Sequence, residues 1–122
     1  GKDYEPANYG NSYTKGNISL KTALAKSSNV VAVKTALDTG LQSVANKAKE
    51  FGFDKIEAYP SIALGTAEVT PLQLAAAYAS FANGGKQVKP TFINKIVSGS
   101  NKLLYQTVES NKQIISPQTA YI

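Results

Sequence analysis

The sequence predicts a mainly α-helical domain with one small β-hairpin. Apolar residues recur at three-and-four spacing over 30–37, 41–51 and 74–81, and a glycine follows each stretch. From Lys89 onward the pattern changes to β-branched and aromatic runs on either side of a polar turn. With 122 residues, 43% of them hydrophobic, the chain is one small domain or part of a larger one.

The segment from Ser19 to Gly40 predicts two helices with a polar break between them. Ser19 is a favourable N-cap for a run of strong helix formers that ends at Lys26. The next three residues, Ser27–Asn29, have short polar side chains that compete for backbone hydrogen bonds, so they favour a break or a fresh N-cap. Helicity then resumes at Val30, and Gly40 supplies the stop.

A third helix is predicted over 41–51, where five apolar residues share one face: Leu41, Val44, Ala45, Ala48 and Phe51. Residues 53–69 show no period and contain Pro60 and Gly65, so they predict an irregular connection. This connection is longer than most loops. Its length indicates a functional or surface role, or a short helix within it.

The fourth helix has a strong start signal. Thr70 is the expected N-cap, Pro71 takes the first helical position, and Gln73 completes a capping box. Asn83–Gly85 should end the helix. We expect its buried face to consist of Leu74, Ala77, Tyr78 and Phe81.

The hairpin is predicted from Thr91–Val97 and Leu103–Val108, with Ser98–Asn101 as the turn. Because an isolated hairpin is marginal in water, it should lie on the helices or on further chain. Ser116 followed by Pro117 repeats the signal for a helix start. So short a helix is unstable alone, so we expect the sequence to stop just after an element begins.

The composition excludes several kinds of chemistry within this chain. Without cysteine or histidine it cannot form a disulfide, an ordinary zinc site or a Ser-His-Asp triad. No cofactor is predicted. The net charge is +5, but the lysines are scattered singly, which favours a solvated basic surface over a nucleic-acid site. No apolar run reaches the ~20 residues of a membrane span.

The polar break lies in a segment that resembles a known motif. Residues 23–33, Ala-Leu-Ala-Lys-Ser-Ser-Asn-Val-Val-Ala-Val, resemble the surroundings of the Ser-x-Asn motif in penicillin-binding transpeptidases, particularly the class A bifunctional enzymes. Further blocks resemble the same family in the same order: Ala63–Gly65, Glu68–Leu72, Ala77–Tyr78, Phe81–Gly85, Ile115–Pro117 and Ala120–Ile122. A lone Ser-x-Asn is weak evidence, but this series covers nearly the whole chain.

The resemblance implies part of the helical lobe of the β-lactamase/transpeptidase-like α/β fold. Residues 1–122 would then be a partial transpeptidase domain that carries Ser-x-Asn, with the Ser-x-x-Lys nucleophile before it and Lys-Thr-Gly after it. It further implies a serine D,D-transpeptidase that cross-links peptidoglycan through an acyl-enzyme, with this fragment inactive alone. The implied partners are D-Ala-D-Ala stem peptides, β-lactams and the missing parts of the domain. The implied location is the extracytoplasmic membrane face, through an N-terminal anchor.

Two residues are the candidate catalytic residues, and the family supplies their roles. Ser27 would relay a proton between the catalytic base and the leaving amine. Asn29 would donate its amide to the acyl-side carbonyl and help to orient the motif lysine. A hydroxyl and a carboxamide are chemically able to do this, because both donate and accept hydrogen bonds. The alternative is that both residues merely cap the helix from Val30; Ser28 could also cap it while the other two face the cleft.

Two apparent motifs are better explained as structure. Ser12–Lys15 formally satisfies Ser-x-x-Lys, but no helical pattern surrounds it that would stack the lysine over the serine. Asp38–Gly40 copies the tripeptide of aspartic proteases, yet that chemistry needs a second carboxylate, and Gly40 is explained as a helix stop. Two further interpretations of the whole chain stay open: a non-catalytic scaffold with the penicillin-binding fold, and a free-standing helical interaction module.

Overall fold

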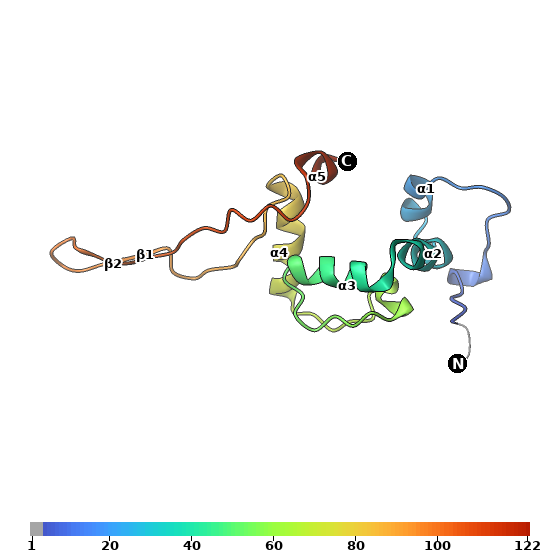
Figure 1. Ribbon diagram of the computed structural model, residues 1–122, viewed down its shortest axis with the longest axis horizontal. Helices are drawn as coiled ribbons and strands as arrows, with labels where there is room; N and C mark the ends of the chain where they lie inside the picture. Colours follow the sequence, from blue (N-terminus) through green and yellow to red (C-terminus); the bar gives the residue numbers. More distant parts are fainter. Residues whose placement is uncertain (1–3) are drawn as a thin grey trace. The chain divides into compact units, whose positions relative to one another are not determined.

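The computed structural model describes residues 4–122. It divides into two compact units: residues up to Lys47 with Lys55–Glu68, and Ala48–Asp54 with Val69–Ile122. With η for a 3-10 helix, the elements in chain order are η1 (Tyr9–Asn11), α1 (Leu20–Ala25), α2 (Asn29–Thr39), α3 (Leu41–Glu50), η2 (Pro60–Leu64), α4 (Pro71–Ala82), β1 (Lys95–Val97), β2 (Leu103–Gln106) and α5 (Pro117–Tyr121) (Figure 1).

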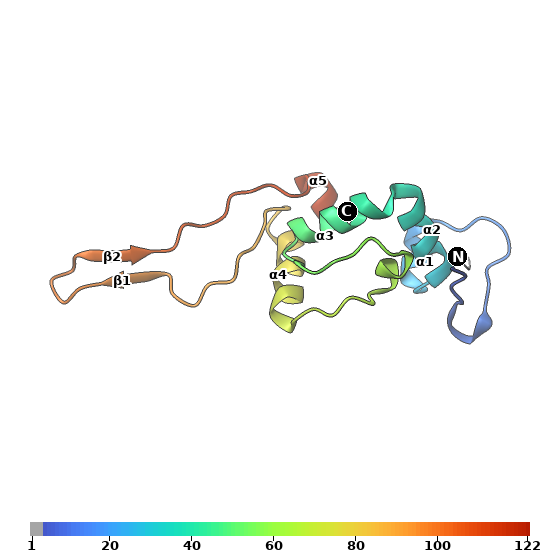
Figure 2. The same cartoon turned by 60° about the horizontal axis from the view of Figure 1, so that its bottom comes forward.

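The first unit is built around α2, which contacts both α1 and η2 (Figures 1 and 2). Ser19 caps α1 as predicted, since its hydroxyl accepts a hydrogen bond from the Thr22 backbone N–H at 3.2 Å. The buried apolar residues of this unit are Ala23, Val33, Ala36, Ala45 and Ile56. The predicted helix pair is confirmed, and α2 begins at Asn29, one residue before the predicted start.

The long connection after α3 contains a short helix, η2. Pro60 occupies its first turn, and Gly65 ends it in the left-handed conformation with φ of 74°. The Thr66 hydroxyl closes the turn by donating to the Ser61 carbonyl at 3.1 Å. Of the two explanations for the length of this connection, the short helix is therefore confirmed.

The predicted capping box of α4 is complete. The Thr70 hydroxyl accepts from the Gln73 N–H at 3.2 Å, and the Gln73 side chain accepts from the Thr70 N–H at 2.9 Å. The Gln73 amide also donates to the carbonyl of Gly52 at 3.3 Å, so it bonds the chain that follows α3. The four residues Thr70–Gln73 thus define the helix start as the sequence indicates.

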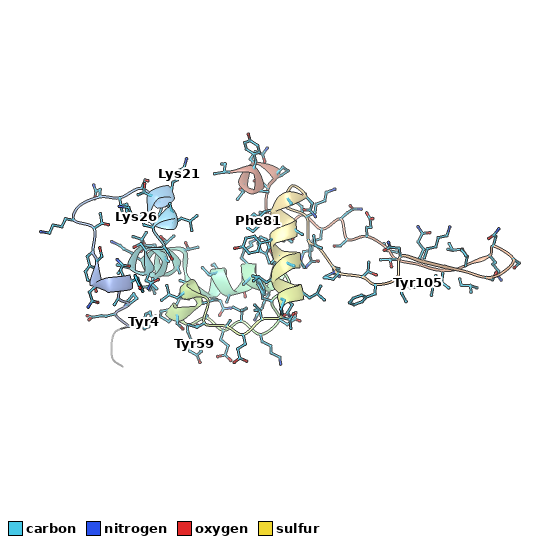
Figure 3. All side chains as sticks on the ribbon, turned by 180° about the vertical axis from the view of Figure 1, so that it is seen from behind. Tyr4, Lys21, Lys26, Tyr59, Phe81 and Tyr105 are labelled. Atoms are coloured by element: carbon cyan, nitrogen blue, oxygen red, sulfur yellow. The ribbon has the colours of Figure 1, made fainter. Side chains whose placement is uncertain are left out.

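The predicted buried face of α4 is wrong except at Ala77. The buried residues are Ala76, Ala77 and Ser80, whereas Leu74, Tyr78 and Phe81 are 45%, 69% and 46% exposed. Small side chains allow the following backbone to approach closely, and Gly85 N–H donates to the Ser80 carbonyl at 2.8 Å. The larger side chains lie on the neighbouring face, where Phe81 stacks on Phe51 with 5.3 Å between ring centroids (Figure 3).

The hairpin is present but shorter than predicted. Lys95, Ile96 and Val97 pair antiparallel with Gln106, Tyr105 and Leu103, with an irregularity after Ile96. Beyond the strands, the Thr107 N–H donates to the Asn94 carbonyl at 2.9 Å, and the Thr91 and Thr107 hydroxyls both donate to the Ile93 carbonyl. Every strand residue, including Tyr105 in Figure 3, is exposed, so within the second unit the hairpin does not lie on α4 or α5.

Helix α5 begins at the predicted cap and contacts α4. The Ser116 hydroxyl accepts from the Thr119 N–H at 3.0 Å. Just before it, the carbonyl of Gly85 accepts from both Ile114 N–H and Ile115 N–H, at 2.9 and 3.2 Å. Among residues 4–122, the helices are all too short or too polar to cross a membrane.

Candidate active site at the α1–α2 corner

The three residues Ser27–Asn29, here called the corner, join α1 to α2 through a defined C-terminal motif. The N–H of Ser28 donates to the Ala23 carbonyl and the N–H of Ser27 donates to the Leu24 carbonyl, both at 3.0 Å. This pair of bonds is the Schellman motif. It places Ser27 in the left-handed region, with φ of 51°. The polar break predicted from the sequence is therefore a tight stop for α1, followed at once by α2.

Ser27 occupies a backbone position that glycine usually takes. A left-handed residue with a Cβ atom costs roughly 1–2 kcal/mol, and such strained residues are concentrated at functional sites. The side chain is exposed, and its hydroxyl has no hydrogen-bond partner within residues 4–122. This hydroxyl is consequently available both to donate and to accept at the surface of the corner.

Asn29, the first residue of α2, is held by the N-terminal loop, which comprises the described residues before α1, 4–19. Its Nδ2 donates to the backbone carbonyl of Ala7 at 2.8 Å, and the side chain is half-buried. That bond uses one of the two amide hydrogens. The second N–H and the Oδ1 atom make no hydrogen bond to the rest of residues 4–122. The carboxamide is thus anchored on one side and unoccupied on the other.

The cap of α2 comes from a distant residue. Ser28 is the N-cap residue, but its side chain makes no capping bond to the helix. Instead, Oδ1 of Asn8 accepts from the Val30 N–H at 3.1 Å and from the Ser28 hydroxyl at 3.3 Å. The explanation that the side chains of the corner cap α2 is therefore wrong: Ser28 takes the N-cap position, but the side chain of Asn8 bonds the helix start.

Two cavities of the first unit meet at the corner. One, of about 450 Å³, is lined mainly by apolar side chains of α1, α2 and the end of η2, including Leu20, Leu24 and Leu64. The other, of about 560 Å³, is lined by the N-terminal loop and by Lys26, which is labelled in Figure 3. All three corner residues line both cavities. Ser27 and Asn29 therefore border both cavities.

Neither of the two apparent motifs in the sequence supplies a nucleophile to this site, although Ser12 and Thr14 line the second cavity. Ser12–Lys15 has an irregular backbone that begins with extended angles at Ser12, so the lysine is not stacked over the serine by a helical turn. Asp38 lies in the last turn of α2, and Gly40 ends that helix with φ of 92°. The corner therefore offers a polar hydroxyl and an oriented amide without a neighbouring activated nucleophile among the described residues.

The whole chain, residues 1–122, matches the family model described as the penicillin binding protein transpeptidase domain. The chain belongs to this family. The match confirms the family inferred from the corner and from the blocks that follow it in the sequence.

Individual relatives and a solved structure agree with this assignment. Penicillin-binding protein 2D of Bacillus subtilis is 41% identical over 123 residues, covering 100% of this chain and 18% of the relative. Penicillin-binding protein 1A of Aquifex aeolicus is 42% identical over 120 residues, covering 98% and 16%. The crystal structure of penicillin-binding protein 1A from Haemophilus influenzae superposes with a TM-score of 0.81 at 27% identity, covering 97% of this chain and 22% of that one.

These matches confirm the class A type and the predicted fold class, a mainly helical part of the penicillin-binding fold with a small hairpin. The chain spans about a fifth of the length of these relatives. The residues that the sequence did not single out are Ala7 and Asn8, which contact the corner through one carbonyl and one side chain. The only available signal was the abundance of asparagine in the first loop.

Proposed function

We propose that this chain is part of a serine D,D-transpeptidase that cross-links peptidoglycan stem peptides ending in D-Ala-D-Ala. In this proposal the full protein forms an acyl-enzyme, is acylated by β-lactams, and works at the extracytoplasmic face of the membrane through an anchor outside residues 1–122. Family membership supports the reaction class. The observation that carries the site is the exposed Ser27 hydroxyl beside the half-anchored Asn29 amide, where two cavities meet.

The proposal assigns separate roles to the two side chains. A serine outside this chain attacks the substrate carbonyl, forms the acyl–oxygen bond and releases the terminal D-Ala amine, which takes up the proton lost by the serine. Ser27 passes that proton, because its hydroxyl can accept from a base and donate to the amine at the same time. Asn29 donates its unoccupied N–H to the carbonyl of the bound substrate or β-lactam.

The remaining parts of the reaction belong to chain outside residues 1–122. We assign the nucleophilic Ser-x-x-Lys pair and the Lys-Thr-Gly strand to it, since the chain spans 18% of the Bacillus subtilis relative. Residues 1–122 then form the part of the transpeptidase domain that lines one side of the cleft. On this assignment the 122-residue chain incubated alone with penicillin forms no covalent adduct.

The experiment measures the second-order rate constant for acylation of the full-length protein by a fluorescent penicillin. Ser27→Ala and Asn29→Ala should each reduce it by about 10²-fold, the effect of losing a proton-transfer group or an oriented donor. Matched controls are Ser43→Ala on the exposed surface of α3 and Asn17→Ala in the exposed first loop. Both controls should acylate at the wild-type rate.

Two results would contradict the proposal in different ways. Wild-type acylation in both Ser27→Ala and Asn29→Ala would show that the corner is not part of the reaction. A wild-type protein that binds penicillin without becoming acylated would favour the non-catalytic scaffold. Neither result is produced by a general loss of folding, because circular dichroism and the two control variants report on that separately.

A further inference from the structure

Asn8 makes three side-chain hydrogen bonds that join the N-terminal loop to the corner. Its Oδ1 accepts from the Val30 N–H at 3.1 Å and from the Ser28 hydroxyl at 3.3 Å. Its Nδ2 donates to the Ser12 carbonyl at 3.0 Å, which closes the loop on itself. One asparagine therefore fixes both the start of α2 and the shape of the loop that contacts it.

The residue before it completes the contact. The carbonyl of Ala7 accepts from Nδ2 of Asn29 at 2.8 Å. Ala7 and Asn8 together thus bond three consecutive residues, Ser28, Asn29 and Val30, through the Ala7 carbonyl and the Asn8 side chain. Immediately after Asn8 the chain turns into η1, where Asn11 N–H donates to the Asn8 carbonyl at 3.0 Å. The turn holds these two residues against the corner.

The bond to Ala7 decides which way the Asn29 carboxamide faces. A free asparagine side chain rotates about two bonds, so its amide nitrogen and oxygen can exchange positions. With Nδ2 held at 2.8 Å from the Ala7 carbonyl, the Oδ1 atom and the second N–H have fixed directions. Preorganised donors of this kind contribute to catalysis because they need no reorganisation during the reaction.

We propose that Asn8 is a positioning residue for the transpeptidase reaction. It acts through Asn29: the bonds of its side chain to Val30 and Ser28 hold the Ala7 carbonyl where it orients the Asn29 amide. This inference rests on the proposed function, because it requires Asn29 to contact the substrate. Asparagine suits the position because it combines an acceptor for two donors with a donor to the Ser12 carbonyl.

The test uses the full-length protein and the acylation rate constant for a fluorescent penicillin. Asn8→Ala should lower this constant by about 10-fold or more, because small displacements of a positioned group have large effects on rate. Asn8→Asp loses the donor to the Ser12 carbonyl but keeps the acceptor for Val30 and Ser28, with a charge that suits a helix N-terminus, so it should acylate clearly faster than Asn8→Ala. Asn17→Ala, an asparagine of the same loop without a hydrogen-bond partner among residues 4–122, should have no effect.

A double-mutant cycle separates positioning from a merely structural role. If Asn8 acts through Asn29, Asn8→Ala should cause little further loss of acylation in an Asn29→Ala background. Melting temperature is measured in the same four proteins, because a purely structural cap lowers it equally in both backgrounds. Where Asn8→Ala fails to fold, Asn8→Asp still tests the inference: its rate shows whether the acceptor for Val30 and Ser28 suffices without the donor to the Ser12 carbonyl.

Three results would overturn the inference. The first is wild-type acylation in a folded Asn8→Ala protein, and the second is an equal loss in both backgrounds of the cycle. The third is an Asn8→Asp protein that folds but acylates as slowly as Asn8→Ala. A wild-type rate in Asn29→Ala alone is a separate outcome: it removes the proposed role of Asn29 in the reaction and this inference with it.

Discussion

Replacing Ser27 with glycine separates the backbone role of this residue from the chemistry of its hydroxyl. Ser27 has φ of 51° at the end of α1, where its Cβ atom is strained. Glycine relieves that strain but removes the hydroxyl. Alanine also removes the hydroxyl but keeps the Cβ atom. The two variants are therefore equal in chemistry and unequal in backbone energy, which makes them a matched pair.

The expected difference follows from the backbone angle. A left-handed non-glycine residue costs roughly 1–2 kcal/mol, and the greater freedom of glycine in the unfolded chain offsets about 0.4–1 kcal/mol of this. We expect Ser27→Gly to exceed Ser27→Ala in free energy of unfolding by about 1 kcal/mol. In a domain of about 150–250 residues this corresponds to roughly 2–4 °C in melting temperature.

The assay combines denaturant unfolding with acylation of the same samples of full-length protein. Ser27→Gly should be the more stable variant, and both should be acylated about 10²-fold more slowly than wild type. Equal stability of the two variants would refute the claim that the corner stores backbone strain. A glycine variant that acylates at the wild-type rate would refute the role of the hydroxyl.

Two further predictions concern the second unit. Gly85→Ala should lower the free energy of unfolding by about 3 kcal/mol or more, because φ is 88° and a Cβ atom would overlap the Ile115 carbonyl oxygen. The control is Gly99→Ala, which has open space around it and should be nearly neutral. Denaturant unfolding compares the two variants. Thr70→Ala should lower the free energy of unfolding by about 1 kcal/mol, because it removes the hydroxyl of the capping box. Thr70→Ser keeps a hydroxyl and should retain the wild-type stability. A denaturant midpoint of Thr70→Ala equal to that of wild type would contradict this.

The sequence predicts an element correctly where the residues that determine it lie within a few positions of one another. The start of α4 is an example, because the cap, the proline and the reciprocal glutamine are contained in Thr70–Gln73. The break at the corner was predicted for the same reason. Its geometry was not, since a Schellman motif usually has glycine at the left-handed position, where this chain has Ser27.

The errors arise where a contact joins distant residues. The cap of α2 depends on Asn8, 22 residues before Val30, and no local pattern indicates that pairing. The buried face of α4 differs from the prediction for another reason: alanine and serine carry a weak apolar signal, yet Ala76 and Ser80 are buried. The candidate residues Ser27 and Asn29 were identified by family resemblance, and their availability to a ligand is seen only in the structure.

The most direct test of the corner as part of the transpeptidase cleft is a crystal structure of the full-length protein acylated by penicillin. We expect the Asn29 amide to lie within hydrogen-bond distance of the amide carbonyl of the bound acyl group, with its Nδ2 still bonded to Ala7. We also expect the Ser27 hydroxyl to face the nucleophilic serine. An acyl group that contacts neither Ser27 nor Asn29 would contradict this expectation.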